Sequence, residues 1–237
     1  MDVDSAGLPT SFESQSLARE RITSFLRGVY GWMCVGLAVT AGVAVSIAGS
    51  DAAVQTLVGN RILFFGLLLA ELGLVFYLSA RVSKLSSSTA ALLFLAYSAL
   101  NGVTISLILL VYSGQSVANT FFVCAGMFGA LALYGTTVRR SLAGVGQFMF
   151  MGLVGLILAS FVGMFWRSDT LQLMISVVGV IVFTGLTAWD AQRLKQMALA
   201  LPAGQVGAYT VVGALSLYLD FVNLFLFLLR LLGNRRS

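Results

Sequence analysis

The sequence contains no histidine, and only 10% of its 237 residues are charged. The absence of histidine excludes the common zinc sites, histidine-based catalysis and a histidine pH switch, so any proton chemistry must use carboxylates. A soluble domain carries about 25% charged residues and could not cover its surface with fewer than half of that number. This scarcity, together with 59% hydrophobic residues, predicts a protein whose surface faces lipid.

Reactive groups and catalytic motifs are also scarce. Cys34 and Cys124, the two cysteines, lie in apolar stretches without neighbouring metal ligands, and we interpret them as small buried side chains. There is no HExxH motif, no nucleophile with a paired base, and no GxGD context for an aspartyl protease at Asp190 and Asp220. We therefore expect neither an enzyme nor a bound cofactor. Nucleic acid is not expected as a partner either, because the basic residues form no contiguous patch.

Seven long apolar runs dominate the chain. Each can cross the hydrocarbon core as a helix, which takes about 20 residues, whereas an open sheet would leave backbone groups unpaired in lipid. The sequence therefore predicts an all-α integral membrane protein with seven transmembrane helices, comprising a polar tail (1–24), a helical domain (25–233) and a short basic tail (234–237). The runs cover residues 25–48, 62–80, 89–111, 117–137, 145–166, 171–189 and 207–232.

The connections between the runs are short, which predicts antiparallel neighbours. The longest, at about 190–206, contains Pro202 and Gly204 and is typical of a loop. Small residues at four-residue spacing, such as Gly126 with Ala130 and the series Gly155, Ala159 and Gly163, favour close approach of helix backbones.

The positions of Lys and Arg predict the orientation. If the N-terminus is inside, nine of these residues lie on the inner face and five on the outer face, which the positive-inside rule favours. We therefore expect a cytoplasmic N-terminus and an external C-terminus. A re-entrant last run is the alternative, because it would return Arg230, Arg235 and Arg236 to the inside.

Three carboxylates lie within or at the ends of apolar runs: Glu71, Asp190 and Asp220. Charged groups in a bilayer are costly, face the bundle interior and often mark ion or proton pathways. Glu71 lies ten residues before Arg81, about 15 Å along a helix, which predicts a mid-membrane position if Arg81 is at the interface. The structural alternatives are a snorkelling anchor for Arg81, an interfacial charge for Asp190 and neutral burial for Asp220.

Two asparagines accompany these carboxylates. Asn223 follows Asp220 at i+3 and so projects from the same helix face. Asn101 lies in the middle of the third run, where a hydrogen bond between helices is the alternative to a place on an ion path.

Five segments of the chain resemble the Bax inhibitor-1 (TMBIM, or YccA-type) family and follow one another in the same order as in that family. The chain is most similar in form to a bacterial member. The resemblance extends from about residue 25 to 233 and is most specific in the last two segments. The segments are VYGWMCVGLAVTA (29–41), AELGLVFYLSAR (70–81), ALNGVTIS (99–106), TAWDAQRLK (187–195) and LYLDFVNLFLFLLRLLG (217–233).

The resemblance implies that the last helix is central and wrapped by the other six. It also implies a pH-sensitive calcium leak in which Asp190 and Asp220 form a hydrogen-bonded, pH-sensing pair, with Arg81 latching onto Asp190. Glu71 matches the family's glutamate in the second helix. On this interpretation Ca²⁺ and H⁺ are the partners in the bilayer, and Asp190 and Asp220 are the candidate Ca²⁺ ligands.

We expect the path to be lined by Glu71, Asn101 and Asn223. Two nearby carboxylates in a low dielectric resist double ionisation, so one shared proton would hold the last two helices together. Loss of that proton would add repulsion and attract Ca²⁺, which prefers carboxylate oxygen.

Two other functions are compatible with the sequence. Bacterial relatives are linked to a membrane-bound AAA protease, so this chain could be a substrate or modulator of membrane-protein quality control, with its N-terminal tail as a handle. A proton-coupled transporter is the third hypothesis. Under each of these hypotheses, the expected location is the bacterial cytoplasmic (inner) membrane.

Overall fold

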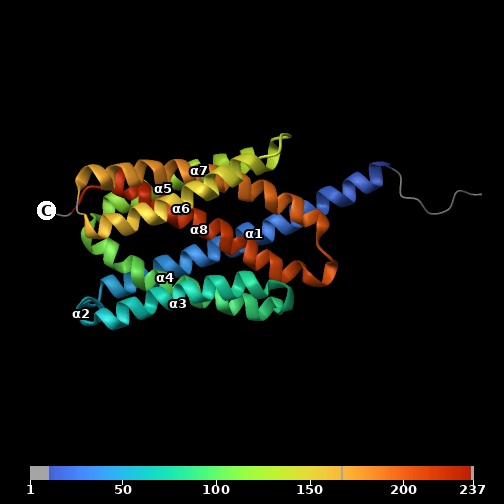
Figure 1. The fold of residues 1–237 in the computed structure, drawn as a ribbon. Coiled ribbons are helices and arrows are strands. Elements are labelled where there is room, and N and C mark those ends of the chain that lie inside the picture. Colours follow the sequence, from blue (N-terminus) through green and yellow to red (C-terminus); the bar gives the residue numbers. More distant parts are fainter. Residues whose placement is uncertain (1–10, 167, 236–237) are drawn as a thin grey trace, which may run out of the picture.

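A computed structural model describes residues 11–166 and 168–235, which form a bundle of helices (Figure 1). Within these residues, seven helices are long and apolar enough to cross a membrane, as the sequence predicted. The elements are α1 (Ser11–Ala48), α2 (Asp51–Gly59), α3 (Arg61–Arg81), η1 (Val82–Lys84), α4 (Ser87–Val111), α5 (Gly114–Thr137), α6 (Ala143–Phe165), α7 (Asp169–Ala200), η2 (Ala203–Gln205) and α8 (Val206–Leu232).

The short connections are possible because polar side chains cap the helix starts. Ser86 Oγ accepts a hydrogen bond from Thr89 N at 3.1 Å, which satisfies one of the free amides in the first turn of α4. Asn60 caps α3 in the same way through Leu63 N at 3.0 Å. Equivalent caps begin α2, α5 and α7 at Ser50, Ser113 and Ser168.

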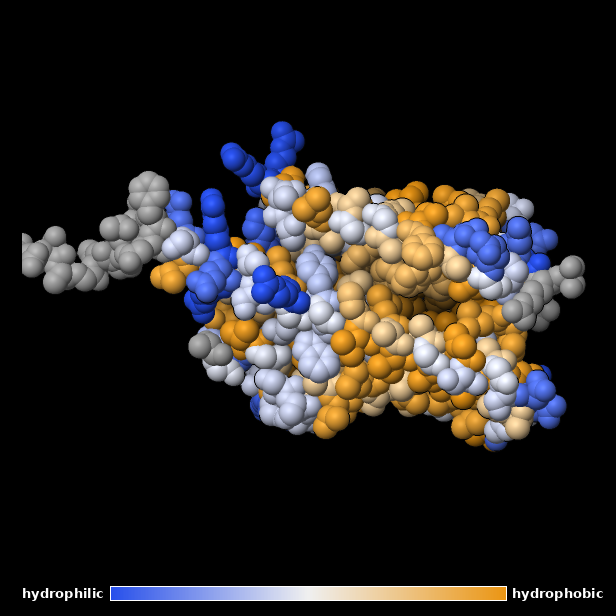
Figure 2. All heavy atoms as spheres, turned by 180° about the vertical axis from the view of Figure 1, so that it is seen from behind, coloured by the Kyte–Doolittle hydropathy of each residue, from blue (hydrophilic) through white to orange (hydrophobic). Residues whose placement is uncertain are grey.

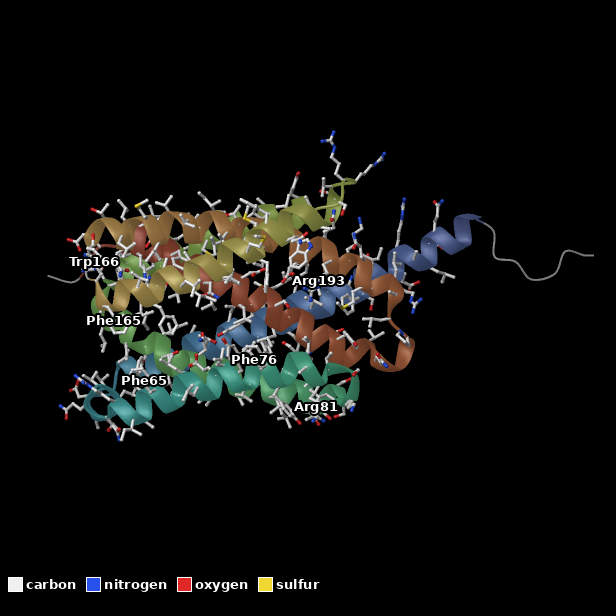
Figure 3. All side chains as sticks on the ribbon, in the orientation of Figure 1. Phe65, Phe76, Arg81, Phe165, Trp166 and Arg193 are labelled. Atoms are coloured by element: carbon white, nitrogen blue, oxygen red, sulfur yellow. The ribbon has the colours of Figure 1, made fainter. Side chains whose placement is uncertain are left out.

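The surface confirms the membrane assignment. Figure 2 shows an apolar band across the middle of the bundle, with hydrophilic side chains gathered toward its two ends. Large side chains point outward from this band, including Phe65, Phe76 and Phe165, which are between 55% and 88% exposed (Figure 3). Such a surface would be unfavourable in water and is stable against lipid chains.

The last helix passes through the middle of the bundle. In Figure 1, α8 runs between α3 and α4 on one side and α5, α6 and α7 on the other. It packs against α1, α3, α4, α5 and α7. In its most apolar 18-residue stretch 67% of the residues are buried, against 44% for α7 and 11–33% for the other five spanning helices.

α8 is also long enough to cross the membrane completely. Its 27 residues form one continuous helix of about 40 Å, which exceeds the roughly 30 Å hydrocarbon core. The described ends of α1 and α8 accordingly lie at opposite ends of the bundle (Figure 1). The length and continuity of α8 therefore favour the full span over the re-entrant alternative.

The first helix begins earlier than the apolar run that predicted it. α1 starts at Ser11, so residues 11–24 of the expected polar tail continue the membrane helix, and in Figure 1 this part projects beyond the other helices. Residues 1–10 of the tail and 236–237 of the basic tail lie outside the described residues. The short helix α2, between α1 and α3, was not anticipated.

The predicted loop at 190–206 is wrong for most of its length, because α7 continues to Ala200. The residues beyond Asp190 are mostly good helix formers, and their polar groups bind backbone atoms at the end of α5 and in the connection between α5 and α6. Gln192 Oε1 accepts from Leu142 N at 2.7 Å, and Lys195 Nζ donates to Thr136 O at 2.6 Å. These charged and polar residues therefore continue the helix, and the loop is reduced to residues 201–205.

Close helix packing occurs at one of the predicted glycines and at others that were not predicted. At Gly163 on α6, a Cβ atom would lie 3.2 Å from Gln172 Nε2 of α7. Nothing lies within 4 Å of the position that a Cβ atom would take at Gly126 or Gly155. At Gly135 on α5, a Cβ atom would collide with the backbone of Ala188 on α7. The spacing rule thus identified small residues without identifying which face of the helix meets a neighbour.

Candidate carboxylate site around the last helix

The structure brings two of the predicted aspartates together where α7 packs against α8. Asp190 and Asp220 are 8% and 5% exposed and close enough for their charges to affect each other, but within the described residues no hydrogen bond joins them, unlike the pair that the family resemblance implied. Arg193, one turn after Asp190 on α7, completes this group: its Nη1 atom lies 3.4 Å from Asp190 Oδ1. The site therefore holds two buried carboxylates and one cation.

Arg193 is held in place by its own helix. Its guanidinium lies 5.3 Å from the ring centroid of Trp189, which adds a cation–π contact to the ion pair. The Arg193 side chain is 46% exposed and that of Asp190 is 12% exposed. The carboxylate pair thus connects to the surface through the arginine.

The structure does not place Arg81 in this site. Arg81 is exposed at the end of α3, and in Figure 3 it lies well apart from Arg193. Within the described residues, the only ion pair that Asp190 makes is with Arg193. Arg81 lies at the end of the second spanning helix, as expected. The cation beside Asp190, however, is Arg193, which lies on α7 like Asp190 itself.

One oxygen of Asp220 has an unusual environment. Asp220 Oδ2 is buried, and no donor group in the described part of the chain reaches it. Burying a carboxylate oxygen without a hydrogen bond is costly, and the cost falls if the oxygen carries a proton or shares one with a second carboxyl group.

Glu71 belongs to a second polar cluster, formed with α4. Its carboxylate accepts hydrogen bonds from Asn101 Nδ2 at 3.3 Å and from Thr104 Oγ1 at 3.0 Å. Glu71 is 9% exposed and has no cation beside it among the described residues. Asn101 thus makes a hydrogen bond between α4 and α3. This is the alternative that the sequence offered to a place on an ion path.

Tyr218 extends the Glu71 cluster to α1 and α8. Its hydroxyl donates to Asn101 Oδ1 at 3.0 Å and lies 2.6 Å from Thr40 Oγ1. Sequence reasoning did not single out Tyr218, Thr40 or Thr104 as site residues. The sequence does show a tyrosine two residues before Asp220, but it does not show which groups this tyrosine contacts. The partners in the cluster depend on how α1, α3, α4 and α8 cross.

The two clusters lie on different faces of α8. Tyr218 and Asp220 are two residues apart, which corresponds to a rotation of about 200° around the helix. Tyr218 accordingly contacts α1 and α4, whereas Asp220 interacts with Asp190 on α7. Any movement of α8 relative to its neighbours would disturb both clusters.

Asn223 joins neither cluster. Its side-chain amide donates to Leu219 O at 2.8 Å, and the residue lines a cavity of about 1010 Å³ between α6, α7 and α8. This cavity lies toward the C-terminal end of α8, and Asn223 is three residues, or about 4.5 Å along the axis, from Asp220. The cavity therefore ends about one helical turn from the carboxylate pair.

The described residues contain no group of three or more metal-ligating side chains. Ca²⁺ takes six to eight oxygen ligands, and two carboxylates supply at most four. Asp190 and Asp220 alone therefore do not complete the coordination shell of a Ca²⁺ ion.

The comparisons with known proteins agree with this architecture. A family model described as "Inhibitor of apoptosis-promoting Bax1" matches residues 22–237. The chain belongs to the Bax inhibitor family. Its similarity to the inner membrane protein YbhL of Escherichia coli K12 is 47% identity over 94% of this chain and 97% of that protein.

Other members of the family are less similar. An uncharacterised protein of Borreliella burgdorferi is 42% identical over 90% of this chain and 93% of its own length. An uncharacterised membrane protein of Streptococcus pyogenes serotype M1 is 39% identical over 76% and 79%. The seven spans and the similarity to YbhL identify a multi-pass protein of the bacterial inner-membrane type.

Proposed function

We propose that this member of the Bax inhibitor family is a pH-sensitive cation leak that favours Ca²⁺ and is gated by Asp190 and Asp220. The N-terminus lies on the cytoplasmic side. The observation that carries the proposal is the charge balance of the site: two carboxylates are buried where α7 packs against α8, and among the described residues Arg193 is the one cation that pairs with either of them.

The charge balance suggests how protons control the site. Arg193 offsets one carboxylate, and a second uncompensated charge in the same buried place is strongly unfavourable. With one proton on the pair, α7 and α8 stay packed and the path is closed. When that proton is lost at higher pH, the two charges repel and also offer oxygen ligands to a hard cation. Flux is therefore expected to rise with pH.

The surroundings of the pair support a route across the membrane. On one side, the half-exposed Arg193 connects the pair to the surface. On the other side, the cavity lined by Asn223 ends about one turn of α8 from Asp220. The α7–α8 contact around the pair lies between these two openings, and we propose that a local separation of the two helices joins them.

The test is Ca²⁺ entry into liposomes that contain the purified protein and a calcium-sensitive dye, measured from about pH 5 to pH 8 on either side of neutrality. Wild-type flux should rise with pH, and the rise should be lost when Asp190→Asn and Asp220→Asn are combined. Asp51→Asn makes the same chemical change at the exposed start of α2 and should leave the profile unchanged. Unaltered pH dependence in the double variant would exclude the pair as the gate.

A second candidate function is modulation of a membrane-bound AAA protease. The observation that favours it is the start of α1, which projects beyond the other helices and is largely exposed around Arg19 and Glu20 (Figure 1). Such a segment is accessible to a soluble partner domain. Deleting residues 2–20 should abolish the effect of the protein on a protease if it is a modulator, whereas a leak should still conduct in liposomes without these residues.

A further inference from the structure

The cavity that Asn223 lines has features that the leak does not need. Its walls are largely side chains of α6 and α7, and its mouth lies at the end of the bundle where α8 finishes. Three charged residues line it there: Asp169 at the start of α7, and Arg230 and Arg235 at and after the end of α8. None of the three makes an ion pair with another described side chain.

Both arginines are held at the mouth. The guanidinium of Arg230 lies 5.7 Å from the ring centroid of Phe227, which itself stacks on Phe183 of α7. The backbone before Arg235 is tied to the α4–α5 connection, because Ser113 N donates to Asn234 O at 3.2 Å. The two positive charges are therefore kept at the opening, where they can attract the anionic group of a ligand.

The depth of the cavity corresponds to one leaflet of a membrane. On α6 the lining extends from Leu153 to Gly163, ten residues or about 15 Å, which is half of the roughly 30 Å hydrocarbon core. Trp166, which is 73% exposed directly after α6, marks the interfacial level at the mouth (Figure 3). The charged groups thus lie at headgroup depth and the remaining walls at acyl-chain depth.

The deep polar side chains do not contradict this assignment. Ser160 Oγ donates to Leu156 O at 2.8 Å, and the Asn223 amide donates to Leu219 O at 2.8 Å, so both bond within their own helices. Leu153, Leu156 and Ile157 supply apolar walls beside them. A hydrocarbon chain can lie against such walls without removing hydrogen bonds from their polar groups.

We propose that this cavity binds a phospholipid whose headgroup carries both a phosphate and a primary ammonium group. The phosphate would pair with Arg230 and Arg235, the ammonium with Asp169, and an acyl chain would follow α6. A purely anionic headgroup would leave Asp169 opposed to it, and a quaternary ammonium has no N–H to donate. The bound lipid would also occupy one end of the proposed ion route. This consequence rests on the proposed leak, whereas the lipid binding does not.

The test is native mass spectrometry of the purified full-length protein in detergent, titrated separately with dioleoyl phosphatidylethanolamine, phosphatidylcholine and phosphatidylglycerol. Phosphatidylethanolamine should bind about tenfold more tightly than the other two. Arg230→Gln and Arg235→Gln should weaken all three lipids. Arg61→Gln, an exposed arginine at the same end of the bundle, is the matched control and should change nothing.

Asp169→Asn gives a result that misfolding cannot imitate, because the protein should still bind phosphatidylglycerol and should lose only its preference for phosphatidylethanolamine. Equal binding of the three lipids by the wild type, or binding unaffected by the cavity variants, would overturn the proposal. Displacement by soluble glycerophosphoethanolamine at comparable concentration would show a headgroup site only and would also contradict it. None of these measurements involves ion flux, so failure of the leak would leave the lipid result intact.

Discussion

Replacing Arg193 by Gln should move the pH at which Ca²⁺ flux rises upward by about one unit. Arg193 is the cation beside Asp190, at 3.4 Å, and it favours the ionised form of the carboxylate pair. Without it, the pair keeps its shared proton to a higher pH. The closed state is therefore retained over a wider range, and opening requires more alkaline conditions.

The magnitude follows from the exposure of the pair. Exposed ion pairs contribute about 0.2–1 kcal/mol, whereas breaking a buried pair costs about 3–5 kcal/mol. Because the Arg193 side chain is 46% exposed and Asp190 only 12%, a value of about 1–2 kcal/mol is appropriate. One pH unit corresponds to about 1.4 kcal/mol, which gives the expected shift.

The assay is the same liposome flux measured across pH, with two matched variants. Arg193→Lys keeps the positive charge, so the midpoint pH of its flux should remain close to that of the wild type. If the stacking of the guanidinium on Trp189 were responsible instead of the charge, Arg193→Lys and Arg193→Gln would shift the midpoint equally. Arg81→Gln removes an exposed arginine that lies away from the pair and should not shift the midpoint. A shift in Arg81→Gln with none in Arg193→Gln would refute the reasoning and restore the latch that the family resemblance implied.

Three further predictions concern stability, measured as the free energy of unfolding in mixed micelles. Tyr218→Phe should destabilise the protein by about 1–2 kcal/mol, because the Tyr218 hydroxyl joins α1 to α4. Tyr97 is also buried but has no such bond among the described residues, so Tyr97→Phe should be nearly neutral. Equal effects of the two changes would contradict this. Gly135→Ala should lower the free energy of unfolding by about 1–3 kcal/mol, because the added methyl group would collide with α7. Gly126→Ala, on the same helix, should not lower it. An unchanged stability of Gly135→Ala would disprove the close contact. Gln192→Ala should cost about 1–2 kcal/mol by leaving backbone groups of the α5–α6 connection unpaired, and no loss would show that water replaces the amide.

The spans could be predicted from sequence because lipid imposes one strong requirement, a continuous apolar helix of sufficient length. The predicted ends agree with the helices within a few residues except at the start of α1 and the end of α7. At both places charged residues were interpreted as the limit of the helix. Hydropathy reports where lipid ends, and a helix can continue into the interface or beyond the bundle.

The site was predictable in part. Asp190 and Asp220 were identified from their sequence contexts, and the structure brings them together. Arg193 lies at i+3 from Asp190, a spacing that places both side chains on one helix face, but the predicted partner of Asp190 was Arg81. The hydrogen bonds of Tyr218 could not be predicted, since they depend on the crossing of α1, α3, α4 and α8, which no local pattern encodes.

The most direct test of the central claim is to follow the shared proton itself. Infrared difference spectra of the reconstituted protein would record the protonated carboxyl band as pH rises, alongside Ca²⁺ flux from the same preparation. The account predicts that the band disappears over the pH range in which flux rises, and that Asp220→Asn removes it. A band that persists while flux rises, or that survives in Asp220→Asn, would contradict gating by this pair.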